Sequence, residues 1–136
     1  RLHAIVKLLL ETHAFLWFIG GSSELSSYAK GPIESEENER YLNVVSLWEM
    51  AIKVSIGKLD VPLPFTRIVR QHVTGNAIEV LSMEPEHLDE QRSLSFHHRD
   101  PFDRLIIAQA IQEEMPLVSR DDAFSDYPIQ LRWKRG

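Results

Sequence analysis

Four acidic residues occupy comparable positions, each just after a predicted strand or in the first turn of a predicted helix. They are Glu11, Glu49, Asp103 and Asp121. Because crowded carboxylates repel one another, a protein rarely gathers several of them unless a cation neutralises their charge. Carboxylate oxygens are hard ligands that suit Mg²⁺ or Mn²⁺, and Mg²⁺ commonly engages phosphates. The pattern therefore predicts metal-assisted chemistry on a phosphate ester, with cations that stabilise the attacking and leaving oxygens.

Each acid taken singly also has a structural explanation. Residues 46–49 fit the S-x-x-E capping box, and residues 100–103 read as an N-cap, a proline at the first helical position and an acid near the helix N-terminus. Asp121 is expected to cap the short segment that follows it. Glu11 is the exception, because Glu is not a preferred N-cap and Thr12 is the better candidate. The structural alternative for Glu11 is a loop acid that faces solvent.

The acids can meet only if the fold brings the strand ends together. Short apolar runs predict strands at residues 4–10, 40–45, 77–83, 116–119 and 129–133. Helices are predicted at residues 12–19, 23–37, 46–55, 65–74, 85–94 and 102–115, and the last should be central and buried because it is apolar nearly all round. The alternation predicts one α/β domain over residues 1–136, with a parallel sheet of four to five strands flanked by helices. Ligands of such sheets bind beyond the carboxyl ends of the strands.

The composition narrows the class of protein. The 136 residues are 43% hydrophobic and 26% charged, as in a globular domain, and the net charge of −5 gives no overall field that attracts nucleic acid. The absence of cysteine excludes disulfides, thiolate metal sites and a cysteine nucleophile, and it is compatible with a cytoplasmic location. We expect no membrane association and no signal peptide, because no apolar run is long enough. A glycine-rich phosphate-binding loop is also missing.

Histidine and tryptophan residues have less specific interpretations. His13 is expected to pack or to face a partner, and His97 and His98 to be structural. Trp17 and Trp48 lie at helical spacing among apolar residues, which predicts a place in the core or at an interface.

Four segments resemble those of PIN-domain proteins, especially the VapC-type toxins of bacterial type II toxin–antitoxin systems. They are LLLETHAFLW, VVSLWEMAIKVSIGKLDVP, LSFHHRDPFDRLIIAQA and PLVSRDDAF. The resemblance implies a PIN-like domain and a cytoplasmic Mg²⁺- or Mn²⁺-dependent endoribonuclease that cleaves RNA, with tRNA or rRNA expected, and inhibits translation. It also implies a small VapB-like antitoxin that neutralises the nuclease, and a homodimer.

The resemblance also assigns roles to individual residues. Those implied to be catalytic and to hold the cations are Glu11, Glu49, Asp103 and Asp121. Those implied to orient or support these acids are Thr12, Ser46, Asp100 and Ser119. Arginines lie near the acid block and are expected to reach RNA phosphates at the rim, unless they form salt bridges with the acids; they are Arg99, Arg104 and Arg120.

One position departs from the family pattern, in which the first acid is usually Asp within LLLDTHAFLW. Here it is Glu11, whose extra methylene moves the carboxylate, and Mg²⁺ demands near-ideal octahedral geometry. Either Glu11 reaches the ion through another rotamer with weakened or altered metal use, or the change, natural or introduced, inactivates the site. The alternative function is therefore a PIN fold without catalysis that binds RNA or protein. A response-regulator-like phosphoacceptor is disfavoured, because the middle strand ends in Ser82-Met83-Glu84 without the required Asp.

Overall fold

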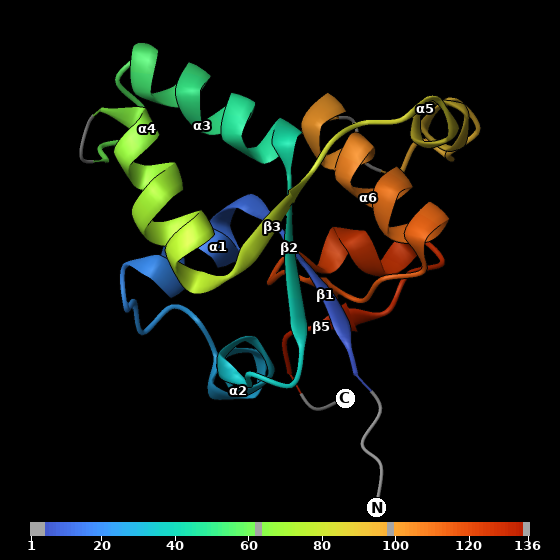
Figure 1. Ribbon diagram of the computed structural model, residues 1–136. Coiled ribbons are helices and arrows are strands. Elements are labelled where there is room, and N and C mark those ends of the chain that lie inside the picture. The colour runs from blue at the N-terminus through green and yellow to red at the C-terminus, as the bar shows by residue number, and fades with distance from the viewer. Residues whose placement is uncertain (1–4, 62–63, 98–99, 135–136) are drawn as a thin grey trace, which may run out of the picture.

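The structure is a computed structural model that describes residues 5–61, 64–97 and 100–134 (Figure 1). Its strands are β1 (Lys7–Leu10), β2 (Glu39–Asn43), β3 (Ile78–Leu81), β4 (Leu117–Val118) and β5 (Leu131–Arg132). They form one five-stranded sheet in the order β3-β2-β1-β4-β5, and every neighbouring pair is parallel. The predicted α/β fold with a parallel sheet is confirmed.

Helices cover both faces of this sheet. They are α1 (Thr12–Ile19), α2 (Ser27–Glu34), α3 (Val44–Ser55), α4 (Phe65–Ile68), α5 (Pro85–Arg92) and α6 (Pro101–Glu113), with a π turn η1 (Val69–Val73) and 3₁₀ turns η2 (Thr74–Asn76) and η3 (Asp122–Asp126). Figure 1 shows α1, α3 and α4 to the left of the sheet and α5 and α6 to its right. No helix among the described residues has the length and apolar character needed to cross a lipid bilayer.

The central strand β1 carries the core on both of its faces. Leu8 and Leu10 pack into one cluster with residues of α1, α2 and α3, whereas Leu9 packs into the other with residues of α6 and η3. Successive side chains of a strand point to opposite faces, so a run of leucines can serve two cores. Helix α6 is buried as predicted, with Ile106 and Ile107 fully inside.

Strand β2 ends earlier than predicted, which moves the start of α3. Asn43 is the N-cap of α3, and its side-chain oxygen accepts a hydrogen bond of 2.7 Å from the backbone N–H of Val45. The preference of Asn for this position therefore prevails over the strand propensity of the two valines that follow. The capping box expected at residues 46–49 is wrong, because Ser46 already lies inside the helix.

Two other helices also differ from the prediction. The helix expected at residues 23–37 is confined to α2, whose N-cap is Ser26, and it continues through Pro32 without a break. The helix expected at residues 65–74 is divided into α4 and the π turn η1.

Candidate active site

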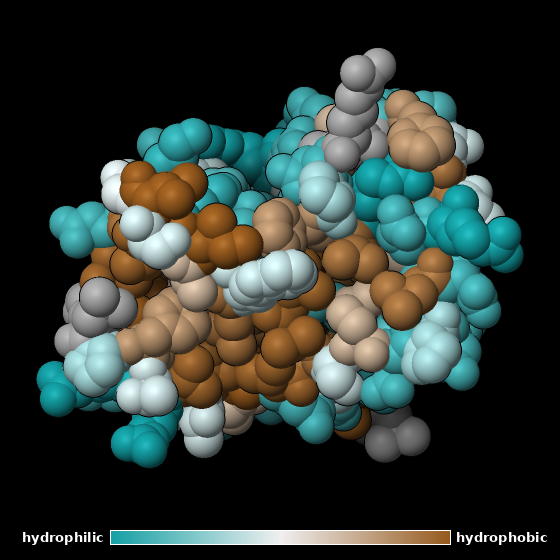
Figure 2. Space-filling view, turned by 90° about the horizontal axis from the view of Figure 1, so that it is seen from above, coloured by the Kyte–Doolittle hydropathy of each residue, from teal (hydrophilic) through white to brown (hydrophobic). Residues whose placement is uncertain are grey.

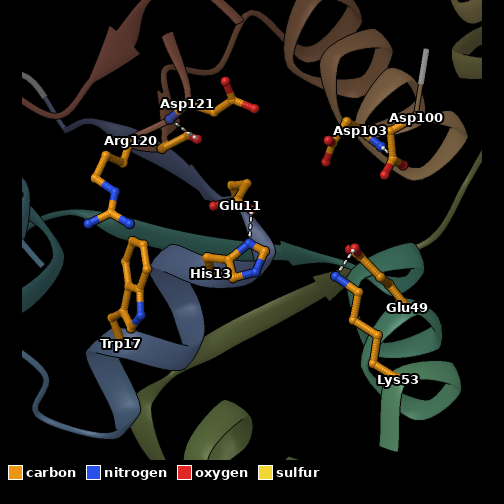
Figure 3. Close-up of a pocket in the computed structure, with 10 residues that line it drawn as sticks. Glu11, His13, Trp17, Glu49, Lys53, Asp100, Asp103, Arg120 and Asp121 are labelled. Carbon is orange, nitrogen blue, oxygen red and sulfur yellow. Dashed lines mark hydrogen bonds and ion pairs between the residues drawn. The ribbon is translucent and has the colours of Figure 1, made fainter. Parts of the chain in front are cut away.

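The predicted acids line one cleft at the carboxyl ends of the strands (Figure 3). The cleft has a volume of about 270 Å³. Its lining residues are Glu11, His13, Trp17, Glu49, Lys53, Asp100, Asp103, Ser119, Arg120 and Asp121. The fold thus brings together acids that are up to 110 positions apart (121 − 11) in the sequence.

Glu11 directly follows β1 and is the N-cap of α1. Its Oε1 accepts a hydrogen bond of 3.2 Å from the backbone N–H of Ala14, and its Oε2 lies 3.0 Å from Nδ1 of His13. The residue is only 6% exposed, so the structural alternative of a solvent-facing loop acid is wrong. Thr12 is not the N-cap either, because the longer Glu11 side chain folds back onto the helix start and leaves Thr12 in the first turn.

The pairing with Glu11 changes the acidity of His13. The hydrogen bond that His13 donates to Glu11 raises the pKa of His13 above its ordinary value of 6.5, and the charges of Glu11 and Glu49 act in the same direction. Burial and the charge of Lys53 oppose this rise in pKa without cancelling it. His13 and Glu11 therefore form a charge-assisted pair in the middle of the cleft.

Glu49 is held by residues of two helices. Oε1 of Glu49 lies 2.8 Å from the hydroxyl of Thr12, which lies 2.9 Å from Oγ of Ser46. An ionised carboxylate can only accept, so the Thr12 proton goes to Glu49 and Ser46 supplies the proton of the other bond. All three residues are buried. The two hydroxyl residues therefore lie where they can fix the orientation of Glu49.

Lys53 neutralises part of the acidic cleft. Its Nζ lies 2.9 Å from Oε2 of Glu49, one helical turn away. Burial lowers the pKa of Lys53, but the hydrogen bond and charge of Glu49, with the charges of Asp100 and Asp103, outweigh burial and raise it. Lys53 was not predicted from the sequence, although Glu followed by Lys four positions later is a recognised helical pair.

The two acids of α6 have different tasks. Asp100 is the N-cap, as predicted, and its Oδ1 accepts hydrogen bonds from the backbone N–H groups of Phe102 and Asp103, at 2.9 and 3.2 Å. Asp103 lies in the first turn of the helix and lines the cleft. Capping by Asp100 thus sets the direction in which α6 presents Asp103.

The last acid follows β4. Oγ of Ser119, which is buried, accepts a hydrogen bond of 3.1 Å from the backbone N–H of Asp121. Oδ1 of Asp121 accepts a hydrogen bond of 3.0 Å from the N–H of Ala123 and caps η3, as predicted. Asp121 itself is exposed at the mouth of the cleft.

Buried amides tie the acid-bearing helices together. Nδ2 of Asn43 donates a hydrogen bond of 2.7 Å to Oε1 of Gln109, and both residues are fully buried. Asn43 caps α3 and Gln109 belongs to α6, so this bond fixes the helix of Glu49 relative to the helix of Asp103. Neither amide was predicted from the sequence.

The predicted arginines have different environments. Arg104 is only 3% exposed and donates hydrogen bonds to the carbonyls of Ser95, Gln91 and Leu94 at 3.0 to 3.2 Å. Its expected position at the rim is therefore wrong, because the side chain is held in the interior. Arg120 does lie at the rim of the cleft. Arg99 lies outside the described residues.

The donor set suits a hard divalent cation, but the acids are not gathered around one point. Among the described side chains, no group of three or more acids or histidines stands close enough together to hold an ion. Glu11 and Glu49 instead pair with His13 and Lys53. The lining oxygens fit Mg²⁺ or Mn²⁺ in chemical type. An ion would therefore compete with these two protein cations for the carboxylates.

The chain is similar to one protein family and to several solved structures. The family model described as PIN domain matches residues 8–130, and no curated protein matches the chain. VapBC2 from Rickettsia felis, solved bound to a DNA fragment from its promoter, is 16% identical with a TM-score of 0.70 and covers 95% of this chain and 100% of its own. A toxin–antitoxin complex from Klebsiella pneumoniae is 16% identical with a TM-score of 0.60, covering 89% of this chain and 92% of its own. FitAcB from Neisseria gonorrhoeae is 14% identical with a TM-score of 0.61, covering 92% of this chain and 96% of its own.

At such identities these likenesses establish a shared fold. The family model matches most of the chain in sequence. The match extends from β1 to the residue before β5 and includes all of the acids that line the cleft. The chain belongs to the PIN domain family.

Proposed function

We propose that the chain is a VapC-like toxin: an endoribonuclease dependent on Mg²⁺ or Mn²⁺ that cleaves tRNA or rRNA in the cytoplasm, inhibits translation and is neutralised by a small antitoxin. The observation that carries the proposal is the convergence of acids from four separate parts of the chain on one cleft. The similar folds solved in toxin–antitoxin complexes support the antitoxin partner. A basic segment of an antitoxin would complement the acidic lining of the cleft.

The residues of the cleft divide the proposed work between them. Glu11, Glu49, Asp103 and Asp121 would hold the metal, which when bound would polarise the scissile phosphate and offset its charge. Thr12, Ser46 and Ser119 hold carboxylates or their backbone in place. Arg120 at the rim would contact an RNA phosphate.

Glu11 makes the proposed activity weaker than that of a site with Asp at this position. Its two oxygens already bond the N–H of Ala14 and the ring of His13, so metal binding would disturb a formed cap and a formed ion pair. This observation also favours the second candidate function, a PIN domain that binds RNA or protein without cleaving it.

A cleavage assay on labelled tRNA and rRNA fragments tests the proposal. We expect slow cleavage with Mn²⁺ or Mg²⁺, faster cleavage by Glu11→Asp, and none by Asp103→Asn, which keeps the shape of the side chain. Cleavage only after Glu11→Asp would identify the chain as an attenuated nuclease. If neither the chain nor Glu11→Asp cuts RNA while RNA or antitoxin binds, the binding module is the correct function.

We also propose a homodimer, supported by apolar side chains on the face seen from above in Figure 2, where α3 and α6 lie in Figure 1. Trp48 of α3 is 60% exposed, and its ring meets the ring of Phe102 edge-on, with 5.3 Å between centroids. Trp48 is therefore not in the core. Val44, one turn earlier in α3, is also exposed, and a contiguous exposed apolar patch is typical of an interaction surface. Light scattering should show a dimer that Trp48→Glu converts to a monomer, whereas Phe96→Glu, at another exposed aromatic, should not.

A further inference from the structure

One wall of the cleft is aromatic and cationic, in contrast to the acids that face it. The guanidinium carbon of Arg120 lies 4.4 Å from the ring centroid of Trp17, over the ring. The Trp17 ring in turn lies 5.8 Å from that of Trp133 and 5.8 Å from that of His13. In Figure 3, Arg120 and Trp17 lie on one side and Asp103 lies on the other.

We propose that Trp17 and Arg120 form a subsite for one nucleotide of single-stranded RNA next to the scissile phosphate. The base stacks on the planar guanidinium, which the Trp17 ring supports from beneath, and the donors at the edge of the guanidinium bind the adjoining phosphate. Proteins bind unpaired bases by stacking them on aromatic rings and guanidinium planes, with little dependence on sequence. The inference depends on the proposed function for its substrate.

The present partner of Arg120 does not prevent this role. Arg120 forms an ion pair with Glu24, and both side chains are about half exposed. Exposed ion pairs contribute little stability, so Arg120 can exchange the carboxylate for a phosphate at small cost. The stacking on Trp17 is the contact that keeps the guanidinium flat against the wall.

The same arginine connects the cleft to a second cavity. This cavity has a volume of about 400 Å³ and is lined by Arg120, Trp133 and Lys134, together with one acid, Asp122, and Ser125 and Leu131. A strand that leaves the acidic cleft over Arg120 would therefore meet a further aromatic ring and a further cation. The chain as a whole carries a net charge of −5, so this local path supplies positive charge that the overall composition does not.

RNA affinity tests the subsite separately from cleavage. All variants are made in the Asp103→Asn background, and the probe is a fluorescein-labelled single-stranded RNA of mixed sequence, followed by fluorescence anisotropy. We expect Trp17→Leu and Arg120→Met each to weaken binding at least about fivefold, the smallest effect of losing one stacked base. We expect Glu24→Gln to strengthen binding, because it frees the guanidinium.

Matched controls come from a similar pair outside the cleft. Arg104 lies over the ring of Phe96 at 4.2 Å, so Phe96→Leu removes a ring under a guanidinium elsewhere on the molecule. Arg67→Met removes an exposed charge. Neither should change the affinity. Because Trp17 also packs against the core, Trp17→Phe and urea unfolding curves distinguish a lost contact from a lost fold.

A direct readout is photocrosslinking of the same RNA carrying 5-iodouridine, with the adduct mapped by mass spectrometry. Adducts at Trp17 support the inference. Unchanged affinity of Trp17→Leu and Arg120→Met overturns it, as does the absence of RNA binding by the unaltered chain. If Trp17→Leu and Arg120→Met bind an antitoxin peptide more weakly but RNA as tightly as before, the wall binds the protein partner. This result also overturns the nucleotide subsite. Failure of the proposed nuclease would show instead as intact RNA binding without cleavage, even after Glu11→Asp.

Discussion

Nζ of Lys53 lies 2.9 Å from Oε2 of Glu49, so a protein cation already stands among the carboxylates of the cleft. The acids that surround it raise the pKa of Lys53, which keeps it charged at neutral pH. Lys53 therefore stabilises the cleft without metal and competes with any divalent ion for the same oxygens.

Removal of this cation should tighten metal binding. We expect Lys53→Met to bind Mn²⁺ severalfold more tightly in calorimetry, because Glu49 no longer has an internal partner. The chain without metal should lose stability, because the acids then repel one another. Lys58→Met, at an exposed lysine outside the cleft, serves as control. Equal Mn²⁺ affinities of Lys53→Met and the unaltered chain would show that the ion pair does not compete with the metal.

The pair of His13 and Glu11 predicts a pH dependence with a definite sign. The pKa of His13 is raised in the folded state, so its contribution to stability is full below about pH 6.5 and is lost as the pH rises through the raised value. Glu11→Gln should return the His13 pKa toward 6.5 in an NMR titration. The difference in free energy of unfolding between the two proteins should then be larger at pH 6 than at pH 8. Glu24→Gln should leave the His13 titration unchanged, and a His13 pKa insensitive to Glu11→Gln would contradict the pairing.

Arg104 should matter for stability rather than for RNA binding. Arg104→Met removes one donor from each of three carbonyl groups and the buried guanidinium with it, and we expect it to lower the free energy of unfolding by about 2 kcal/mol in urea. Arg104→Lys should not restore stability, because one ammonium group cannot reproduce the forked geometry. Arg67→Met should have little effect. A stable Arg104→Met protein with impaired RNA binding would restore the original assignment of this residue to the substrate.

The buried hydrogen bond between Asn43 and Gln109 should stabilise the fold by holding α3 against α6. Asn43→Ala removes both an N-cap and a buried hydrogen bond, and we expect a loss of about 2–3 kcal/mol in the free energy of unfolding. Gln109→Met and the double variant complete a cycle, which should show a coupling of about 1 kcal/mol. Additive effects would mean that the two amides act independently.

Much of the fold could be predicted from local patterns. The apolar runs indicated the strands, and parallel strands must bring their carboxyl ends to one edge. The meeting of the acids in one cleft was predicted for the same reason, since acids that follow parallel strands lie at one edge of the sheet. Asp100 was predicted as an N-cap because the Asp-Pro pair fits only that position well.

The errors arose where two local preferences competed or where tertiary contacts decided. Glu is a weak N-cap on average, but at Glu11 the contact with His13 adds to the cap. Val44 and Val45 favour a strand, but Asn43 caps a helix here. Its side-chain oxygen accepts from Val45 N–H, and its amide nitrogen donates a hydrogen bond to Gln109 of α6. The carbonyls that accept hydrogen bonds from Arg104 belong to residues 9 to 13 positions earlier, at and beyond the end of α5. No periodic pattern in the sequence predicts such contacts.

The order of the strands in the sheet differs from their order in the sequence. β1 pairs with β2 on one side, but its other neighbour is β4, where Leu9 lies beside Leu117. A nascent chain therefore cannot complete the central strand pairs, or bring Asp121 to the same cleft as Glu11, until residues 117–121 have left the ribosome. Pairings between segments so distant in sequence form slowly, because the chain loses the entropy of loop closure before the new contacts stabilise it. A chain whose translation has not passed residues 117–121 thus lacks the complete acidic cleft, which delays the proposed activity against RNA until those residues can pair.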